Sequence, residues 1–247
     1  MDNKNLKHVP NDVFTKVVLW LEKVVLFDHL TDDQTVALFG KMAANNSTSR
    51  LRNIRLDGAG MGKVNPAIFA TALTRVEEVD ISYSNLSHLH KNALFEQMCK
   101  KSQITKLNMM SINLACVPAA TLAKATLGLV EAELSYTHLN SEQVNVVFEQ
   151  LAGRMEKQLK FLNLVGNNLR SVSPDALAEG FNSLEITNLN ETRIDGEQVK
   201  ALLDVMVKKT MLRKIKMDFS DVCQYEDTLV AAGRKNGVHF IIEEEDE

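Results

Sequence analysis

The sequence predicts an α/β solenoid, a stack of repeated units that each contain one short β-strand and one α-helix. Apolar residues recur at the first, fourth and sixth places of one six-residue frame, as in residues 51–56. Successive copies start alternately 25 and 28 or 30 residues apart, and all four prolines fall at one place relative to the frame. A fixed period of this length is the signature of a solenoid. The eight copies start at Leu21, Leu51, Val76, Ile104, Leu129, Leu159, Leu184 and Leu212.

Each copy of the frame predicts a strand, and the segment after it predicts a helix. The prolines at 10, 66, 118 and 174 directly precede apolar-periodic segments such as 66–73. Proline is tolerated in the first turn of a helix, where its missing N–H would be unpaired. In the longer units, polar residues followed by Glu or Gln predict the helix start. We therefore expect helices over 144–151 and 199–207.

No single unit needs to be stable alone, because its apolar residues are covered when it packs against its neighbours. The frame residues at positions 1, 4 and 6 form one continuous core when neighbouring units pack together. Connections through a helix make the strands parallel. We expect a single domain over 1–247, with an N-terminal half-repeat cap at 8–20, repeats over 21–222, a C-terminal cap at 223–242 and an acidic tail at 243–247. The C-terminal cap is expected to end in an edge strand, which the tail keeps soluble.

The frame Leu-x-x-Leu-x-Leu with a further apolar residue, as in Leu159, Leu162, Leu164 and Leu169, resembles a leucine-rich repeat protein. Two alternating unit lengths resemble the ribonuclease-inhibitor-like subfamily. That resemblance implies a horseshoe with the parallel sheet on its concave face and the helices on its convex face. This family places Asn or Cys at position 9, counted from the start of the frame. In this chain only Asn167 matches that pattern.

Composition excludes several classes of function. The formal net charge is -4, which argues against a nucleic-acid binder. Three cysteines without close spacing predict neither a metal site nor a disulfide framework, and no apolar run is long enough to span a membrane. The chain is expected to be a monomer in the cytoplasm, or in the nucleus, without a cofactor. The loop at 58–63 lacks the Gly and the Ser or Thr that a phosphate-binding loop needs.

Catalytic motifs are missing from the sequence, so we expect no enzyme. His88 and His90 lack a third metal ligand in sequence and are expected in a solvated loop. The carboxylates follow the repeat, and pairing any two as acid and base is arbitrary.

The candidate binding residues lie at positions 3 and 5 of each strand, whose side chains should point into the concave face. Charges of opposite sign fall on neighbouring strands, where they favour correct register and also suit a partner of mixed charge. Phe161 and Ile186 are expected side by side, and aromatic residues at position 8 either pack on the next loop or contact a partner. The predicted protein-binding residues are Arg55, Glu78, Asp80, Tyr83, Lys106, Glu133, Tyr136, Phe161, Asn163, Ile186, Lys214 and Lys216.

The leading hypothesis is a scaffold that captures another protein on its concave face, and the resemblance to ribonuclease inhibitor suggests an inhibitor as one version. One alternative is the substrate-receptor subunit of a ubiquitin ligase, because residues 9–19 resemble the opening of an F-box. Another alternative is an innate-immune or damage-sensing module.

Overall fold

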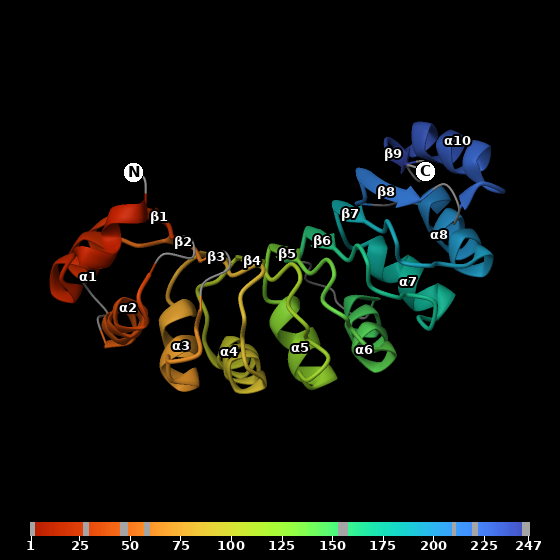
Figure 1. Ribbon diagram of the computed structural model, residues 1–247. Helices are drawn as coiled ribbons and strands as arrows, with labels where there is room; N and C mark the ends of the chain where they lie inside the picture. Colours follow the sequence, from red (N-terminus) through yellow and green to blue (C-terminus); the bar gives the residue numbers. More distant parts are fainter. Residues whose placement is uncertain are drawn as a thin grey trace. The chain divides into compact units, whose positions relative to one another are not determined.

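The computed structural model describes residues 3–26, 30–44, 49–56, 60–152, 158–208, 211–218 and 222–243. The chain divides into two compact units, Met1–Val117 and Pro118–Glu247. In each unit, short strands alternate with helices, and the helices cover one face of a parallel sheet and leave the other open (Figure 1). This is the α/β solenoid that the sequence predicts.

The first unit begins with a short 3-10 helix and continues as four strand-containing repeats. The strands are parallel neighbours in chain order, and the helix α1 packs beside α2 as the first helix of the stack. The elements are η1 (Asn3–His8), α1 (Asn11–Trp20), β1 (Lys23–Val25), α2 (Asp32–Ala44), β2 (Asn53–Arg55), α3 (Pro66–Leu73), β3 (Glu78–Asp80), α4 (His88–Lys100) and β4 (Lys106–Asn108).

The second unit repeats this arrangement, again with parallel strands in chain order. Its last strand, β9, was expected to be a closing edge strand, and it pairs in parallel with β8 after a helix of its own. The elements are α5 (Ala119–Thr126), β5 (Glu131–Glu133), α6 (Ser141–Ala152), β6 (Phe161–Asn163), α7 (Pro174–Phe181), β7 (Ile186–Asn188), α8 (Gly196–Lys208), β8 (Lys214–Asp218), α10 (Glu226–Asn236) and β9 (His239–Glu243).

The apolar frame forms the core between sheet and helices. In every strand from β1 to β8 the position-4 residue is buried, as with Ile54 and Leu162 at 2% and 0% exposure. The helices supply aromatic rings, and Phe148 and Phe181 on neighbouring helices meet edge to face with ring centroids 4.9 Å apart. Burial of a large apolar side chain stabilises the fold by roughly 1.5–3 kcal/mol, so the stacked frame accounts for the cohesion of each unit.

Two kinds of helix start alternate along the chain. Pro66 and Pro174 stand in the first turns of α3 and α7 behind the side-chain caps Asn65 and Ser173. Pro10 and Pro118 lie one residue earlier and occupy the N-cap position itself.

The helices α2, α6 and α8 begin with a reciprocal capping box, in which a cap side chain and a glutamine side chain bond each other's backbone amides. Asp195 and Gln198 show this pattern at α8, with distances of 2.9 and 3.0 Å. The same pairs form between Thr31 and Gln34 and between Asn140 and Gln143.

At α4 the glutamine is replaced by His90, and here the sequence-based expectation of a solvated loop is wrong. His90 is only 3% exposed, and its Nε2 atom lies 2.8 Å from the carbonyl oxygen of Val64 in the preceding repeat. Its Nδ1 atom lies 2.7 Å from the Ser87 hydroxyl. His88, the first residue of the helix, is exposed as expected.

Part of what the sequence singled out falls outside the described residues. This holds for residues 58 and 59 of the loop at 58–63, for Phe219, which is the position-8 aromatic residue of the last copy of the frame, and for 244–247 of the acidic tail. Among the described residues, no helix combines the length and apolar character that crossing a membrane requires.

Candidate protein interface

The open face of each sheet, opposite the helices, is called the strand face here and carries the side chains at strand positions 3 and 5. Exposure alternates along the strands, so that in β2 Asn53 and Arg55 point outward while Ile54 is buried. Ten of the twelve predicted binding residues take these outward positions. Tyr83 and Tyr136 lie instead in the turns that follow β3 and β5.

In the first unit the strand face is held by polar pairs between neighbouring strands. The Arg55 Nε atom lies 3.3 Å from an Asp80 carboxylate oxygen, and the Lys106 Nζ atom lies 3.8 Å from Glu78. The other Glu78 oxygen accepts a bond of 2.6 Å from the Asn53 amide. Each such pair contributes perhaps 0.2–1 kcal/mol and favours the observed register. Unlike charges therefore lie on neighbouring strands, as predicted.

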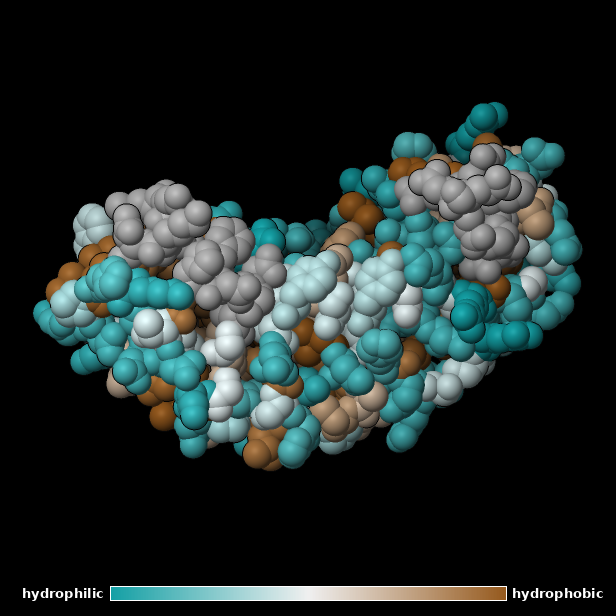
Figure 2. Space-filling model, in the orientation of Figure 1, coloured by the Kyte–Doolittle hydropathy of each residue, from teal (hydrophilic) through white to brown (hydrophobic). Residues whose placement is uncertain are grey.

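In the second unit an apolar pair stands at the middle of the strand face. Phe161 and Ile186 are register partners on β6 and β7, and Ile186 is 38% exposed. Phe161 and Val165, which follows β6, are half-buried. Figure 2 shows brown surface beside β6 and β7 within a mostly teal molecule. The sequence-based expectation that Phe161 and Ile186 lie side by side on this face is confirmed.

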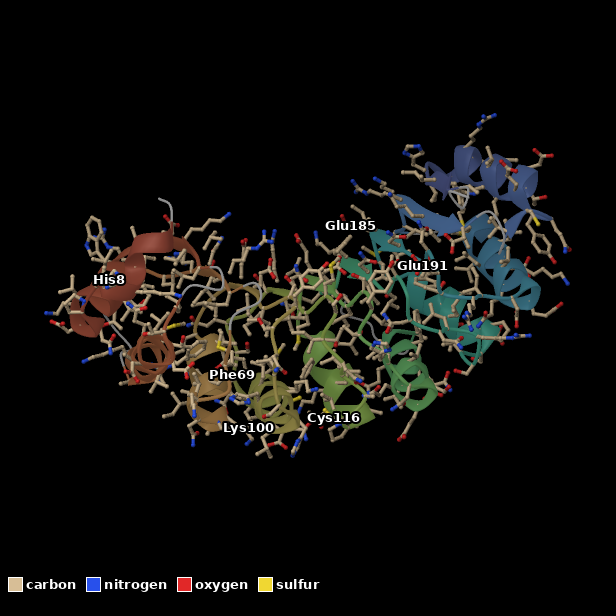
Figure 3. The ribbon with its side chains drawn as sticks, in the orientation of Figure 1. His8, Phe69, Lys100, Cys116, Glu185 and Glu191 are labelled. Atoms are coloured by element: carbon tan, nitrogen blue, oxygen red, sulfur yellow. The ribbon has the colours of Figure 1, made fainter. Side chains whose placement is uncertain are left out.

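Cations gather on β8, on one side of this apolar pair. Arg213 is exposed, and Lys214 and Lys216 are half-buried with their side chains on the strand face. The register partners of Lys214 and Lys216 on the two neighbouring strands are not carboxylates. These partners are Ile186 and Asn188 on β7, and His239 and Ile241 on β9. Glu185, next to Arg213, already forms an ion pair of 3.0 Å with Lys160 (Figure 3).

Acidic side chains lie on the other side of the apolar pair, on β5. Glu131 is the register partner of Phe161, and Glu133 is that of Asn163. The Asn163 amide donates to Glu133 at 2.6 Å, and the Ser135 amide donates to the same carboxylate at 3.0 Å. The strand face of the second unit thus changes from acidic to apolar to basic between β5 and β8.

The two tyrosines have left-handed backbone conformations, with φ of 56° at Tyr83 and 54° at Tyr136. This conformation costs a non-glycine residue roughly 1–2 kcal/mol. The Tyr83 hydroxyl donates to the Met110 sulfur at 2.9 Å, and the ring remains 59% exposed. Each ring thus leans on the turn of the next repeat and still offers aromatic surface to a partner.

Tyr136 is positioned by a glycine in the next turn. A Cβ atom on Gly166 would lie 2.3 Å from Cδ1 of the Tyr136 ring, and Gly166 itself has a φ of 70°. The Tyr136 hydroxyl donates to Glu191 at 2.6 Å, which fixes the other end of the ring (Figure 3).

Buried polar side chains that join successive repeats were not predicted from the sequence. The Gln198 amide donates to the carbonyls of Leu169 and Val172 at 2.9 and 2.7 Å, although the sequence suggested only a helix cap. The recurrence of glutamine at this place in three repeats was the available signal.

A shifted pKa is found on the helix side of the molecule, at Lys200. A hydrogen bond to Glu197 and the negative charge of Glu197 raise the pKa of Lys200, and Tyr225 adds a smaller effect in the same direction.

The described residues contain no cluster of three His, Cys, Asp or Glu side chains suited to a metal ion. Cys99, Cys116 and Cys223 are not joined in disulfides. The strand face offers apolar, aromatic and charged side chains for non-covalent contact.

No family model and no curated protein matches this chain. Among solved structures, the fold is that of a leucine-rich repeat protein. The chain is similar to the leucine-rich repeat-containing protein LegL7 from Legionella pneumophila, with a TM-score of 0.57 and 16% identity over 98% of this chain and 81% of that chain. A chain of the Rad7 and Elc1 complex in yeast is matched with a TM-score of 0.39 and 12% identity over 97% and 81% of the two chains.

Proposed function

We propose that this protein is a non-catalytic scaffold that binds another protein on its strand face, with the Phe161–Ile186 pair as the central contact. The observation that carries the proposal is that exposed Ile186 and half-buried Phe161 lie in register on a mostly polar face. The buried frame beneath them already forms the core, so the fold does not need them for packing. Apolar and aromatic residues surrounded by polar groups are the usual centre of a protein interface.

Polar and aromatic residues on the strand face of each unit add to the selectivity of the proposed binding in different ways. Arg55, Asp80, Glu78 and Lys106 in the first unit bond one another across strands, which leaves them little charge to offer a partner. Charged groups at the edge of an interface influence association rate and partner choice more than affinity. Tyr83 and Tyr136 supply rings whose orientation is already fixed, which lowers the entropy lost on binding.

The finer features of the proposal have their own support. The alternation of proline-type and glutamine-type helix starts supports a ribonuclease-inhibitor-like member of the leucine-rich repeat proteins. Three cysteines outside disulfides, two of them exposed, support a reducing compartment such as the cytoplasm or nucleus. We propose that the chain acts there as a monomer, as a single domain, without a cofactor, a membrane or a nucleic acid.

Site-specific photo-cross-linking in cells tests the proposal. A photoreactive amino acid at position 186 places the probe at the centre of the face, and the same residue at exposed Glu179 on α7 is the matched control. We expect position 186 to give discrete cross-linked bands that Phe161→Asp abolishes. Bands of equal strength at 179, or bands insensitive to Phe161→Asp in a variant with an unchanged circular dichroism spectrum, would place binding elsewhere.

A further inference from the structure

We infer that the strand face of the second unit selects an acidic segment of its protein partner, in which carboxylates lie on one side of a bulky apolar residue. This inference rests on the proposed function and adds the chemistry of the partner. The structural basis is one row of side chains at position 3 of successive strands. The row is Glu131, Phe161, Ile186, Lys214 and His239.

The basic end of the row attracts carboxylates. Lys214 is flanked in register by Ile186 and His239, and Lys216 by Asn188 and Ile241. Arg213 adds an exposed guanidinium beside them. The register positions on both sides of Lys214 lack carboxylates, and Glu185 beside Arg213 already pairs with Lys160. A carboxylate of the partner can therefore approach Lys214 and Arg213. Guanidinium and ammonium groups form their strongest hydrogen bonds with carboxylates.

The apolar anchor lies at the right distance for the same short segment to use both features. Neighbouring strands are about 4.8 Å apart, and an extended peptide advances about 3.3 Å per residue. A peptide crossing the strands with an apolar side chain over Phe161 and Ile186 therefore places its next one to three residues over β8. Carboxylates at those residues reach Lys214 and Arg213.

The acidic end of the row gives the bound segment a direction. Glu131 and Glu133 lie on β5, on the far side of Phe161 from the cations. A carboxylate of the partner placed over β5 would meet like charge, whereas one placed over β8 meets opposite charge. Only one orientation brings the acidic residues to β8, and repulsion of this kind is a common source of specificity.

The first unit shows what the same face looks like without this feature. There the position-3 carboxylate of Glu78 is bonded on one side by Asn53 at 2.6 Å and approached on the other by Lys106 at 3.8 Å. Charges that already pair with neighbours offer less to a ligand than Lys214, whose register partners are Ile186 and His239. The inference is therefore confined to the second unit.

The row also favours a protein over a nucleic acid as the source of the negative charge. A nucleic acid carries a phosphate at every nucleotide and needs a continuous basic surface. A strand crossing this face would bring phosphates over Glu131 and Glu133. A peptide can combine an apolar side chain with acidic residues on one side only.

Peptide selection tests the inference with a defined probe. Random twelve-residue peptides displayed on phage are selected on the full chain, on Arg213→Glu with Lys214→Glu, and on Arg170→Glu with Lys124→Glu. The last pair carries the same charge change at exposed positions outside the strand face. We expect the wild-type chain and the control to enrich peptides with Asp or Glu next to an aromatic or aliphatic residue. Reversal of Arg213 and Lys214 should weaken the enriched peptides at least about tenfold in fluorescence anisotropy.

Each outcome separates this inference from the proposed function. Peptides that bind, that lose binding in Phe161→Asp and that lack acidic residues would overturn the acidic specificity and leave the scaffold proposal standing. The absence of any peptide sensitive to Phe161→Asp would overturn both. A labelled 20-base-pair duplex DNA is measured in parallel, and tighter binding of DNA than of the peptides, lost in the charge-reversed variant, would also overturn the inference. Circular dichroism and a thermal melt confirm that each variant is folded.

Discussion

His90 provides a sharp test of how successive repeats are joined. Its ring nitrogens contact the Val64 carbonyl at 2.8 Å and the Ser87 hydroxyl at 2.7 Å. Because a carbonyl only accepts hydrogen bonds, Nε2 carries the proton and Nδ1 accepts from the hydroxyl. The Gln198 amide makes the corresponding connection at α8. We therefore predict that His90→Gln preserves the connection and that His90→Leu breaks it.

The magnitude follows from the groups that leucine leaves without a partner. The buried Val64 carbonyl loses its donor from His90, which costs about 1–3 kcal/mol. The His90 ring also meets Phe69 edge to face with centroids 5.3 Å apart, a contact worth roughly 0.5–1.5 kcal/mol. We expect His90→Leu to lower the free energy of unfolding by about 2–4 kcal/mol. His90→Gln keeps a donor and should remain within about 1 kcal/mol of the wild type.

Equilibrium unfolding in urea, followed by circular dichroism, measures both variants against the wild type. The expected order of midpoints is wild type, then His90→Gln close behind it, then His90→Leu well below. If His90→Gln were as destabilised as His90→Leu, the histidine would act through ring packing and not through its bond to Val64. If His90→Leu matched the wild type, the hydrogen bond would contribute nothing and the reasoning would fail.

Three further predictions concern the core, the first helix and the strand face. Asn167→Ala should lower the free energy of unfolding by about 2–5 kcal/mol. The buried Asn167 side chain donates to backbone carbonyls at 2.7 and 3.1 Å and accepts from a backbone amide at 3.0 Å. An unchanged urea midpoint would contradict this prediction. On α1, Phe14→Ala should cost about 3–5 kcal/mol because the ring is 3% exposed, whereas Val17→Lys, at 54% exposure, should stay within about 0.5 kcal/mol in the same assay. A double-mutant cycle of Arg55→Ala and Asp80→Ala should give a coupling free energy of unfolding of no more than about 1 kcal/mol, and this coupling should shrink in 1 M salt. A larger coupling that salt does not change would mean that the ion pair is shielded from water.

The sequence predicts the strand register well because strand side chains alternate with a period of two. Once Leu162 and Thr187 are assigned to the core, Phe161 and Ile186 must face the other way. The same alternation marks residues 238–242 as a strand. It carries no information on strand direction, and the parallel pairing of β9 with β8 depends on the intervening helix α10.

Long-range contacts explain what the sequence did not predict. The polar segment around His90 has the composition of a loop, and only the carbonyl of Val64, 26 residues earlier, makes it a buried helix start. The left-handed turns at Tyr83 and Tyr136 are equally hidden, since tyrosine has no preference for that conformation. Their geometry is imposed by backbone bonds to the next turn, as from the Tyr136 amide to the Val165 carbonyl at 2.7 Å.

The energetics of the strand face explain how one fold can serve both stability and recognition. A cross-strand charge pair is worth at most about 1 kcal/mol, so the fold loses little if a strand such as β8 carries cations that its neighbours do not match. The apolar frame beneath supplies several times that amount per repeat. Residues at outward positions can therefore vary without unfolding the stack. Where the charge on one strand is not matched by its neighbours, a need for stability does not explain that charge. In this chain such a charge lies at Lys214, next to the exposed Ile186. The side chains that the fold needs least are thus the ones best placed to meet a partner.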